Sequence, residues 1–443
     1  MGFGFKRYFR LYDFFIIIGC FAMFFPSFHV YLESAGAILI NGLVIVFSFI
    51  AIALNYRKNV KNQLKVLETK SFKLISGIFI VLLIHIPISM SLGSLFSDFT
   101  IVTRDFYELH RPILYLLIFC LAYFSITSYE DLEKLNKIMI FIFVCFIIFG
   151  INQNIRFSDD LTVLYTKFHN ARTRRLSIPF VNPYDYAFVM ILFIFYYLFR
   201  FVYNHWAYLF FFIIALVLFM LTQSRSMAVG LLFGLIIVVP IFMIYNQRMP
   251  LFKGRLSFGM MKYGILSIAG IIGFSILLSY ILTNFSYLTK SFVRIIESGS
   301  LESMDNATSI RKDQLMFTLD LAVSNPFILL FGNGAAKEKM EFVESMYTYF
   351  LFRYGLIGLV VYFLIPLLLG IKYTIICLKL LTTKDALFPF FAAILVWLIC
   401  LPLCSIGNNI TEQVRVSFLY YSILAILIKG SVVLRKRKII NLI

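Results

Sequence analysis

Residues 74–95 read LISGIFIVLLIHIPISMSLGSL and contain no Asp, Glu, Lys or Arg. An α-helix rises about 1.5 Å per residue, so about 20 apolar residues cross the hydrocarbon core of a bilayer. Stretches of similar character recur along the whole chain. This stretch therefore predicts a membrane-spanning helix, and it sets the fold class of the chain as an all-α polytopic membrane protein.

Twelve such stretches predict about twelve transmembrane helices. Their limits are 13–31, 34–54, 73–95, 112–128, 136–152, 183–203, 205–222, 226–245, 263–283, 346–371, 385–404 and 414–431. The first follows Lys6, Arg7 and Arg10, as in a signal peptide, but no clear small-residue cleavage site follows it. We expect it to be retained as a signal anchor, which makes residues 1–443 a single integral membrane domain.

The composition excludes a soluble enzyme, a disordered protein and a secreted protein held together by disulfides. Of the 443 residues, 61% are hydrophobic and 14% are charged, whereas soluble globular proteins are about 45–50% apolar and about 25% charged. The six cysteines fall inside apolar stretches without CxxC spacing, and no His or Cys cluster has the spacing of a zinc site. We therefore expect no disulfide, no metal and no cofactor.

The net charge of +18 would suggest a nucleic-acid partner in a soluble protein. Here the tendency of cytoplasmic loops to be positive explains it better. With both termini in the cytoplasm, the cytoplasmic segments hold 24 Lys and Arg and 6 Asp and Glu, while the outer segments hold 16 of each kind. The whole excess of positive charge then lies on the cytoplasmic side, which predicts an N-in, C-in orientation and no nucleic-acid partner.

Two predicted outer loops are long. The first, 153–182, is rich in arginine, and the second, 284–345, lies between the ninth and tenth spans. The second is the largest polar segment of the chain, and we expect it to contain amphipathic helices that lie on the outer leaflet. An outer loop of this size favours chemistry outside the membrane.

Capping signals place the helices of the large loop. Thr308 or Ser309 can cap a helix, and Pro326 stops it. Gly332-Asn-Gly334 then predicts a turn, because glycine adopts turn conformations without steric cost. We expect residues 337–344 to begin another helix that continues into the tenth span.

Positive charges on the outer side suggest an anion-binding site. The first loop carries Arg172, Arg174 and Arg175, and single arginines stand at Arg225 and Arg311. A guanidinium group is a planar fork of donors that binds phosphate oxygens bidentately. Arg225 lies in a very short turn between two spans, so it must face the protein interior or a polar cavity. For the others, contact with lipid headgroups or outer carboxylates stays open.

The outer acids and histidines are the candidates for a general base, the group that accepts a proton from a substrate. Glu344, just before the tenth span, is the first candidate, although an acid there also stabilises the helix dipole. His169 in the first loop is the second choice, and simple exposure is its alternative. Tyr347 can stack on a sugar or belong to the interfacial aromatic belt. We expect His85, in the third span, to be a core histidine with satisfied hydrogen bonds.

Four short stretches follow one another at the outer ends of the predicted spans. They are Asn182-Pro-Tyr-Asp-Tyr186 after the arginine-rich loop, Thr222-Gln-Ser-Arg-Ser226, Ser309-Ile-Arg311 with Pro326 and Phe331-Gly-Asn-Gly334, and Glu344-Ser-Met-Tyr347 with Gly355 and Gly358. In order, spacing and position they resemble the O-antigen polymerase (Wzy) and O-antigen ligase family of bacterial membrane glycosyltransferases. The resemblance covers residues 165–365 and the overall topology.

The resemblance implies a glycosyltransferase of the bacterial inner membrane whose active site faces the periplasm. Its substrate would be an undecaprenyl-pyrophosphate-linked oligosaccharide, with a flippase and a chain-length regulator as expected partners. Ligases of the family carry a histidine where this chain has Glu344, which favours the polymerase over the O-antigen ligase. The R-x10-G pattern of some polymerases is absent, because Pro183, Asp185, Tyr186 and Ala322 stand eleven residues after Arg172, Arg174, Arg175 and Arg311.

The implied reaction joins repeat units by attack of an acceptor hydroxyl on the anomeric carbon of the donor chain, with undecaprenyl pyrophosphate leaving. Preorganised arginines would stabilise the charge on the pyrophosphate, so Arg225, Arg311 and the base Glu344 are the predicted catalytic residues. The residues expected to bind the substrate are Arg172, Arg174, Arg175, His169, Tyr347 and Asn182. A lipid-linked oligosaccharide flippase or a solute transporter stays an alternative, although few charges lie within the spans.

Overall fold

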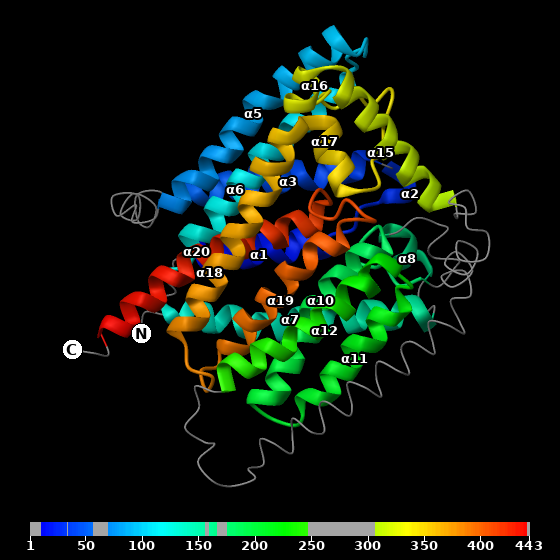
Figure 1. The fold of residues 1–443 in the computed structure, drawn as a ribbon. Helices are drawn as coiled ribbons and strands as arrows, with labels where there is room; N and C mark the ends of the chain where they lie inside the picture. The colour runs from blue at the N-terminus through cyan, green and yellow to red at the C-terminus, as the bar shows by residue number, and fades with distance from the viewer. Residues whose placement is uncertain are drawn as a thin grey trace, which may run out of the picture. The chain divides into compact units, whose positions relative to one another are not determined.

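The computed structural model describes residues 10–32, 34–55, 70–155, 159–165, 175–246 and 306–440. In these residues every regular element is a helix, as Figure 1 shows. The chain divides into two compact units, one of residues 1–231 and 318–443 and the other of residues 232–317.

The helices, in chain order, are α1 (Leu11–Phe24), α2 (His29–Leu32), α3 (Ser34–Asn55), α5 (Lys70–Phe96), the 3₁₀ helix η2 (Thr103–Leu109), α6 (His110–Ser125), α7 (Tyr129–Ile155), α8 (Asp159–Tyr165), α10 (Pro183–Tyr203), α11 (Tyr208–Leu221), α12 (Arg225–Asn246), α15 (Asn306–Ser324), α16 (Pro326–Phe331), α17 (Met346–Ile357), the π-helix η5 (Gly358–Leu364), α18 (Ile365–Leu380), α19 (Phe388–Cys404) and α20 (Val414–Ile440).

Seven helical stretches in the described residues are long and apolar enough to cross a membrane. They are Ala35–Asn55, Lys70–Phe96, Thr103–Ser125, Tyr129–Ile155, Pro183–Tyr203, Met346–Leu380 and Arg415–Lys438. Four further apolar helices are shorter: α1, α11, α19 and the part of α12 up to Ile241. The protein is therefore an all-helical, multi-pass membrane protein.

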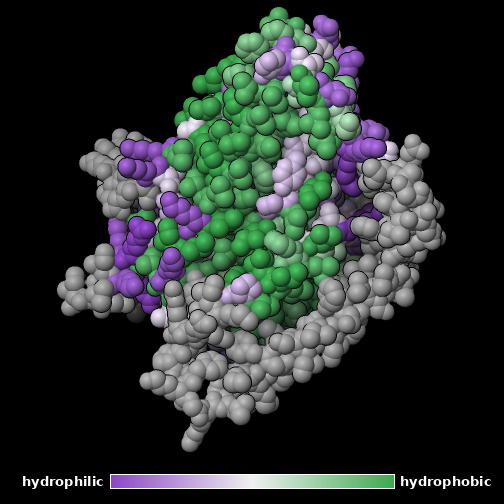
Figure 2. Space-filling view, viewed as in Figure 1, coloured by the Kyte–Doolittle hydropathy of each residue, from purple (hydrophilic) through white to green (hydrophobic). Residues whose placement is uncertain are grey.

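The surface of the helices is apolar, which suits a protein surrounded by lipid. Phe49 and Leu54 on α3 are 63% and 72% exposed, and α5 likewise exposes Val81 and Ile84. Hydrophobic residues dominate the face drawn in Figure 2, and hydrophilic ones lie at its edges, among them the C-terminal end of α20. Bilayer contact explains this exposure, because water would oppose it.

The interior of the first unit is built around α10, α19 and α20. The side chains of α10 are almost all buried, and α10 packs against α11 and α19. α20 packs against α6 and α18. Trp397 of α19 donates its ring N–H to the carbonyl of Phe188 at 2.9 Å, so even this aromatic donor is satisfied inside the bundle.

The predicted spans coincide with helices wherever the chain is described, with some limits adjusted. The first span, predicted as 13–31, ends as a helix at Phe24, because Pro26 disfavours helical backbone at Phe25. The tenth continues from α17 through η5 and α18 as one apolar stretch, Met346–Leu380. The ninth, 263–283, lies outside the described residues, and the total of twelve spans stays a prediction.

The first helix predicted in the large loop is confirmed as α15, which ends at Ser324, before Pro326. The predicted cap is wrong, because Thr308 and Ser309 both lie inside this helix, which already includes Asn306. The helix predicted over 337–344 is wrong. Those residues form turns and irregular backbone, and Ser345 is the N-cap of α17. Long-range contacts prevail over helix propensity here, because the side chains of Lys337 and Glu341 are bound to residues of η2.

The turn predicted at Gly332-Asn-Gly334 is wrong, because the backbone there is irregular without a turn, with φ of +77° and +72° at the two glycines. This segment lies against α17, where the N–H of Asn333 donates to the carbonyl of Phe352 at 2.8 Å. Gly355 has a φ of +64°, and a Cβ there would lie 2.4 Å from the carbonyl carbon of Leu330. Glycine is therefore required for this close approach, which fixes the segment after α16 against α17.

Contacts join segments that the sequence places on the same side of the membrane. On the predicted cytoplasmic side, Ser71 Oγ lies 2.6 Å from Tyr373 Oη. On the predicted outer side, Lys337 Nζ lies 3.0 Å from Glu108 Oε1. The contacts agree with the alternation of sides along the chain, while the assignment of one side as cytoplasmic stays a prediction.

Candidate functional site

A buried carboxylate, that of Glu108 at the end of η2, binds three cations. Its Oε1 accepts from Arg353 Nη1 at 2.7 Å and from Lys337 Nζ at 3.0 Å. Its Oε2 forms an ion pair with Arg111, whose Nε lies 2.9 Å away. Arg353 belongs to α17, Lys337 to the segment that follows α16, and Arg111 to α6. Glu108 therefore connects parts of the chain that are far apart in sequence.

A second carboxylate, that of Glu412, lies on the far side of Arg111. Glu412 Oε2 accepts from a guanidinium nitrogen of Arg111 and from the hydroxyl of Tyr115, the latter at 2.8 Å. The hydroxyl of Tyr349 lies 3.2 Å from Glu108 Oε2 and 3.1 Å from Glu412 Oε2. It carries one proton, so it donates to one of the two carboxylates at a time.

We call these residues the Glu108 network; they are Glu108, Arg111, Tyr115, Lys337, Tyr349, Arg353 and Glu412. Its three cations and two carboxylates give it a formal charge of +1. The side chains of Glu108 and Arg353 are only 1% and 3% exposed. Withdrawing an ion from water costs several kcal/mol, so burial on this scale requires the pairing that is observed.

One cation of the Glu108 network, Arg353, keeps an unused hydrogen-bond donor. Within the described part of the chain, no acceptor lies within hydrogen-bonding distance of the buried Nε of Arg353. Burial lowers the pKa of the Lys337 amine, and nearby Glu108 partly offsets this effect. The arrangement therefore concentrates positive charge in a poorly hydrated place, where an anion is held strongly.

The loop between α19 and α20 connects this network to other polar residues. Asn408 Nδ2 donates to Ser226 Oγ at 2.5 Å. Ser405 accepts at its carbonyl from the N–H of Met346 at 3.1 Å. We call residues 405–415 the connecting segment, because it contacts the start of α12, the start of α17 and, through Glu412, the Glu108 network.

A second buried pair of charges lies at the end of the connecting segment. Arg415 and Asp185 are both almost fully buried and interact electrostatically. Arg415 Nη2 donates to the carbonyl of Phe25 at 2.5 Å, and the Asn182 side chain hydrogen-bonds to Asp185. Among the described residues, neither Arg415 Nε nor Asp185 Oδ1 has a hydrogen-bond partner.

Arg225, a predicted catalytic residue, is half-buried at the first position of α12, next to Ser226, which binds the connecting segment. Arg175 lies against the preceding turn, where its Nε donates to the carbonyl of Thr222 at 3.4 Å and its Nη2 to that of Gln223 at 3.3 Å. The structure therefore brings Arg175 to the turn that carries Arg225.

Glu344, the predicted base, is exposed and immediately precedes the N-cap of α17. This position fits both roles left open for it, a base and a helix-dipole charge. Tyr347 is half-buried, and its hydroxyl donates to the carbonyl of Pro402 at 2.9 Å. Tyr347 thus holds α17 against the end of α19, close to the connecting segment.

The remaining predicted residues are not part of this arrangement as described. Arg311 lies on α15, in the part that belongs to the second compact unit. His169, Arg172 and Arg174 lie outside the described residues.

The residues that the sequence reasoning missed share a local signature. Glu108 and Arg111 are three residues apart at the start of one span, and Glu412 and Arg415 are three residues apart at the start of another. This E-x-x-R spacing, repeated at two predicted outer span ends, is the sequence signal that could have identified them as candidate site residues.

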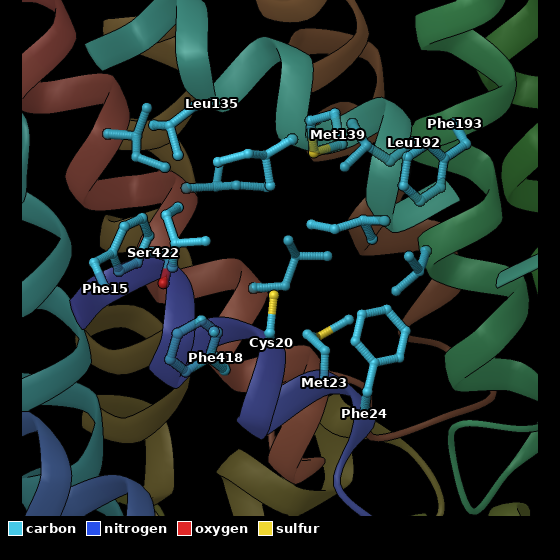
Figure 3. Close-up of a pocket in the computed structure, with 18 of the residues that line it drawn as sticks. Phe15, Cys20, Met23, Phe24, Leu135, Met139, Leu192, Phe193, Phe418 and Ser422 are labelled. Atoms are coloured by element: carbon cyan, nitrogen blue, oxygen red, sulfur yellow. The ribbon is translucent and has the colours of Figure 1, made fainter. Parts of the chain in front are cut away.

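An apolar cavity of about 90 Å³ lies apart from these charges, among α1, α7, α10 and α20. Figure 3 shows Met23 and Phe24 of α1, Leu192 of α10 and Phe418 of α20 around it. Such walls suit hydrocarbon and not a sugar or a phosphate. In the part of the chain described, no three His, Cys, Asp or Glu side chains gather as a metal site would require.

No protein-family model and no curated protein matches the chain.

Proposed function

We propose that this protein polymerises undecaprenyl-pyrophosphate-linked oligosaccharide repeat units, as an O-antigen polymerase of the bacterial inner membrane does. The active site faces the periplasm, both termini are cytoplasmic, and the chain crosses the membrane about twelve times. The product is a surface polysaccharide such as O-antigen. This proposal begins from the four stretches that resemble the polymerase and ligase family.

The observation that carries the proposal is the meeting of three of those stretches on the connecting segment. Ser226 of the second stretch binds Asn408, and Met346 of the fourth binds Ser405. Asp185 of the first interacts electrostatically with Arg415. Stretches that share only a helix-packing role have no reason to gather polar groups at one end of an apolar bundle, whereas a reaction site does.

The proposed mechanism assigns the chemistry to side chains alone. A hydroxyl of the acceptor unit attacks the anomeric carbon of the donor chain, the bond to the pyrophosphate oxygen breaks, and the hydroxyl proton passes to a base. Arg225 and Arg175 stabilise the charge that develops on the leaving pyrophosphate, and the same role for Arg311 stays a prediction from the sequence. Glu344, exposed at the start of α17, takes the proton.

The experiment is complementation of a deletion strain. Wild-type protein restores the ladder of long surface glycans, and the uncomplemented strain carries a single repeat unit on each acceptor. Arg225→Ala loses the ladder, because one removed donor to a developing oxyanion costs about 10²–10³ in rate. Lys58→Ala, at a predicted cytoplasmic position, keeps it. Normal long chains from Arg225→Ala would remove that residue from the mechanism.

A flippase or transporter has one specific observation in its favour. Buried ionisable groups are common in transport pathways, and Glu108 and Arg353 are such groups. The same strain separates the two functions. A bare acceptor with single units trapped on the cytoplasmic side would indicate a flippase and contradict the polymerase.

A further inference from the structure

Three cations converge on a single carboxylate in the Glu108 network. We propose that Arg111, Lys337 and Arg353 form a binding site for the phosphate group of an anionic ligand, and that Glu108 is the resident counter-ion which this phosphate displaces. The inference goes beyond the polymerase proposal, whose arginines lie elsewhere, and it does not depend on that reaction.

The donor geometry is that of an oxyanion site. Donors reach Glu108 from three different elements, at 2.7 Å from Arg353, 3.0 Å from Lys337 and 2.9 Å from Arg111. A carboxylate has two oxygens to offer, whereas a phosphate group has at least one more. The Nε of Arg353, which has no acceptor among the described residues, would gain a partner from a larger anion.

The charge balance also favours exchange of one anion for another. Glu412 stays on Arg111, and Asp105 accepts from two backbone N–H groups, that of Lys337 at 3.0 Å and that of Val102 at 2.9 Å. Glu341 pairs with the exposed Arg104 and offers only its carbonyl oxygen to Arg353. Without Glu108 the network would carry a formal charge of +2, which matches the charge of a phosphate monoester or a pyrophosphate linkage.

The site has an open edge and an element that can shift. The side chains of Arg111 and Lys337 are 24% and 16% exposed, so an anion can approach them first. Glu108 lies next to the last residue of the 3₁₀ helix η2. The hydrogen bonds of 3₁₀ helices have poorer geometry than those of α-helices, so η2 moves at lower cost than α6 or α17.

The test compares thermal unfolding of purified wild-type protein and Glu108→Gln in detergent, with and without sodium pyrophosphate at constant ionic strength. Without pyrophosphate the variant has the lower Tm. Pyrophosphate then raises the Tm of Glu108→Gln more than that of the wild type, and the variant binds it at least tenfold more tightly. A purely structural ion pair predicts the lower Tm with no gain from pyrophosphate, and this result would overturn the proposal.

Matched variants identify the donors. In the Glu108→Gln background, Lys337→Gln weakens pyrophosphate binding about tenfold to a hundredfold, because it removes one charged hydrogen bond. Lys339→Gln makes the same charge change two residues away, at an exposed position, and leaves binding unchanged. Equal losses in both variants would mean general electrostatic attraction and contradict the site.

A second substitution covers the case in which Glu108→Gln does not fold. Glu108→Asp keeps the charge and withdraws the carboxylate by one methylene, so it also tightens pyrophosphate binding, by a smaller factor. Absence of a gain in this variant contradicts the proposal as well.

The source of the phosphate is distinguished by nanodiscs of defined composition. A lipid-borne phosphate predicts that undecaprenyl phosphate raises the Tm more than pyrophosphate in phosphatidylcholine discs, and a free anion predicts the reverse. Failure of both anions overturns the site. Pyrophosphate binding without glycan polymerisation would refute the polymerase alone, whereas polymerisation without any gain from Glu108→Gln would refute the site alone.

Discussion

The protein contains two clusters in which an arginine, a carboxylate and a tyrosine meet, at opposite predicted sides of the membrane. In one, Arg353 binds Glu108 at 2.7 Å and lies over the ring of Tyr349. In the other, Arg437 binds Asp385 at 3.2 Å and lies over the ring of Tyr129. The residue types are nearly the same, but the side chains are 3% and 1% exposed in the first pair and 42% and 12% in the second.

The difference teaches that burial, and not residue type, decides what such a cluster does. An exposed ion pair contributes at most about 1 kcal/mol, because water and salt screen it. A buried pair contributes little net stability, yet its disruption leaves an uncompensated charge and costs several kcal/mol. The Glu108 network therefore has the electrostatic strength that ligand binding needs. The Asp385 cluster holds α20 against the segment before α19.

The largest expected effect comes from removing the central carboxylate of each cluster. Glu108→Ala leaves three cations without their common partner and destabilises the fold by about 3–5 kcal/mol. Asp385→Ala removes an exposed pair and the hydrogen bond to the N–H of Leu387 before α19, at a cost of about 1–2 kcal/mol. Thermal unfolding in detergent compares the stability lost in the two variants. Equal losses would contradict the conclusion that burial distinguishes the two clusters.

A smaller effect is expected from removing one tyrosine hydroxyl from each side. Tyr115→Phe leaves the buried carboxylate of Glu412 without a donor that lies at 2.8 Å, which costs about 1.5–3 kcal/mol. Tyr129→Phe removes the hydroxyl that donates to Asp385 at 2.7 Å, where water can replace it. The Tm of the first variant should fall clearly further. A larger fall for Tyr129→Phe would mean that the Asp385 cluster is the more constrained one.

The smallest expected effect is that of Arg437→Met, below about 1 kcal/mol. Raising the salt concentration from about 0.1 M to 1 M shortens the Debye length from about 10 Å to about 3 Å. The Tm difference between Arg437→Met and wild type should vanish in high salt, whereas that of Arg353→Met should persist. Salt sensitivity of the Arg353→Met difference would show that water reaches the Glu108 network.

Hydropathy predicted the helices of this protein because a membrane span is a local property of about 20 residues. The positive φ at Gly332 and Gly334 is equally local, although the backbone between them does not form the predicted turn. The prediction for His85 also holds, since Nδ1 lies 2.7 Å from the Tyr362 hydroxyl and Nε2 lies 3.1 Å from the Phe331 carbonyl. The spans can be read from neighbouring residues alone, whereas the partners of His85 are 277 and 246 residues away in the sequence.

The Glu108 network could not be predicted in the same way. Glu108 and Arg353 are 245 residues apart, and Arg111 and Glu412 are 301 residues apart. Composition and periodicity place each charged residue at the end of a span. They do not identify its partner, because the partner depends on how the helices pack. The wrong helix over 337–344 has the same origin, because Lys337 is held by Glu108 rather than by its own helix.

The most direct test of the polymerase proposal is a reaction of purified protein in nanodiscs with a lipid-linked repeat unit as its only substrate. The length of the glycan and the released undecaprenyl pyrophosphate are followed together. We predict stepwise lengthening, with one undecaprenyl pyrophosphate released for each new linkage, and no lengthening with Arg225→Ala. Unchanged substrate with wild-type protein, together with movement of the unit across the bilayer in liposomes, would contradict a polymerase and indicate a transporter.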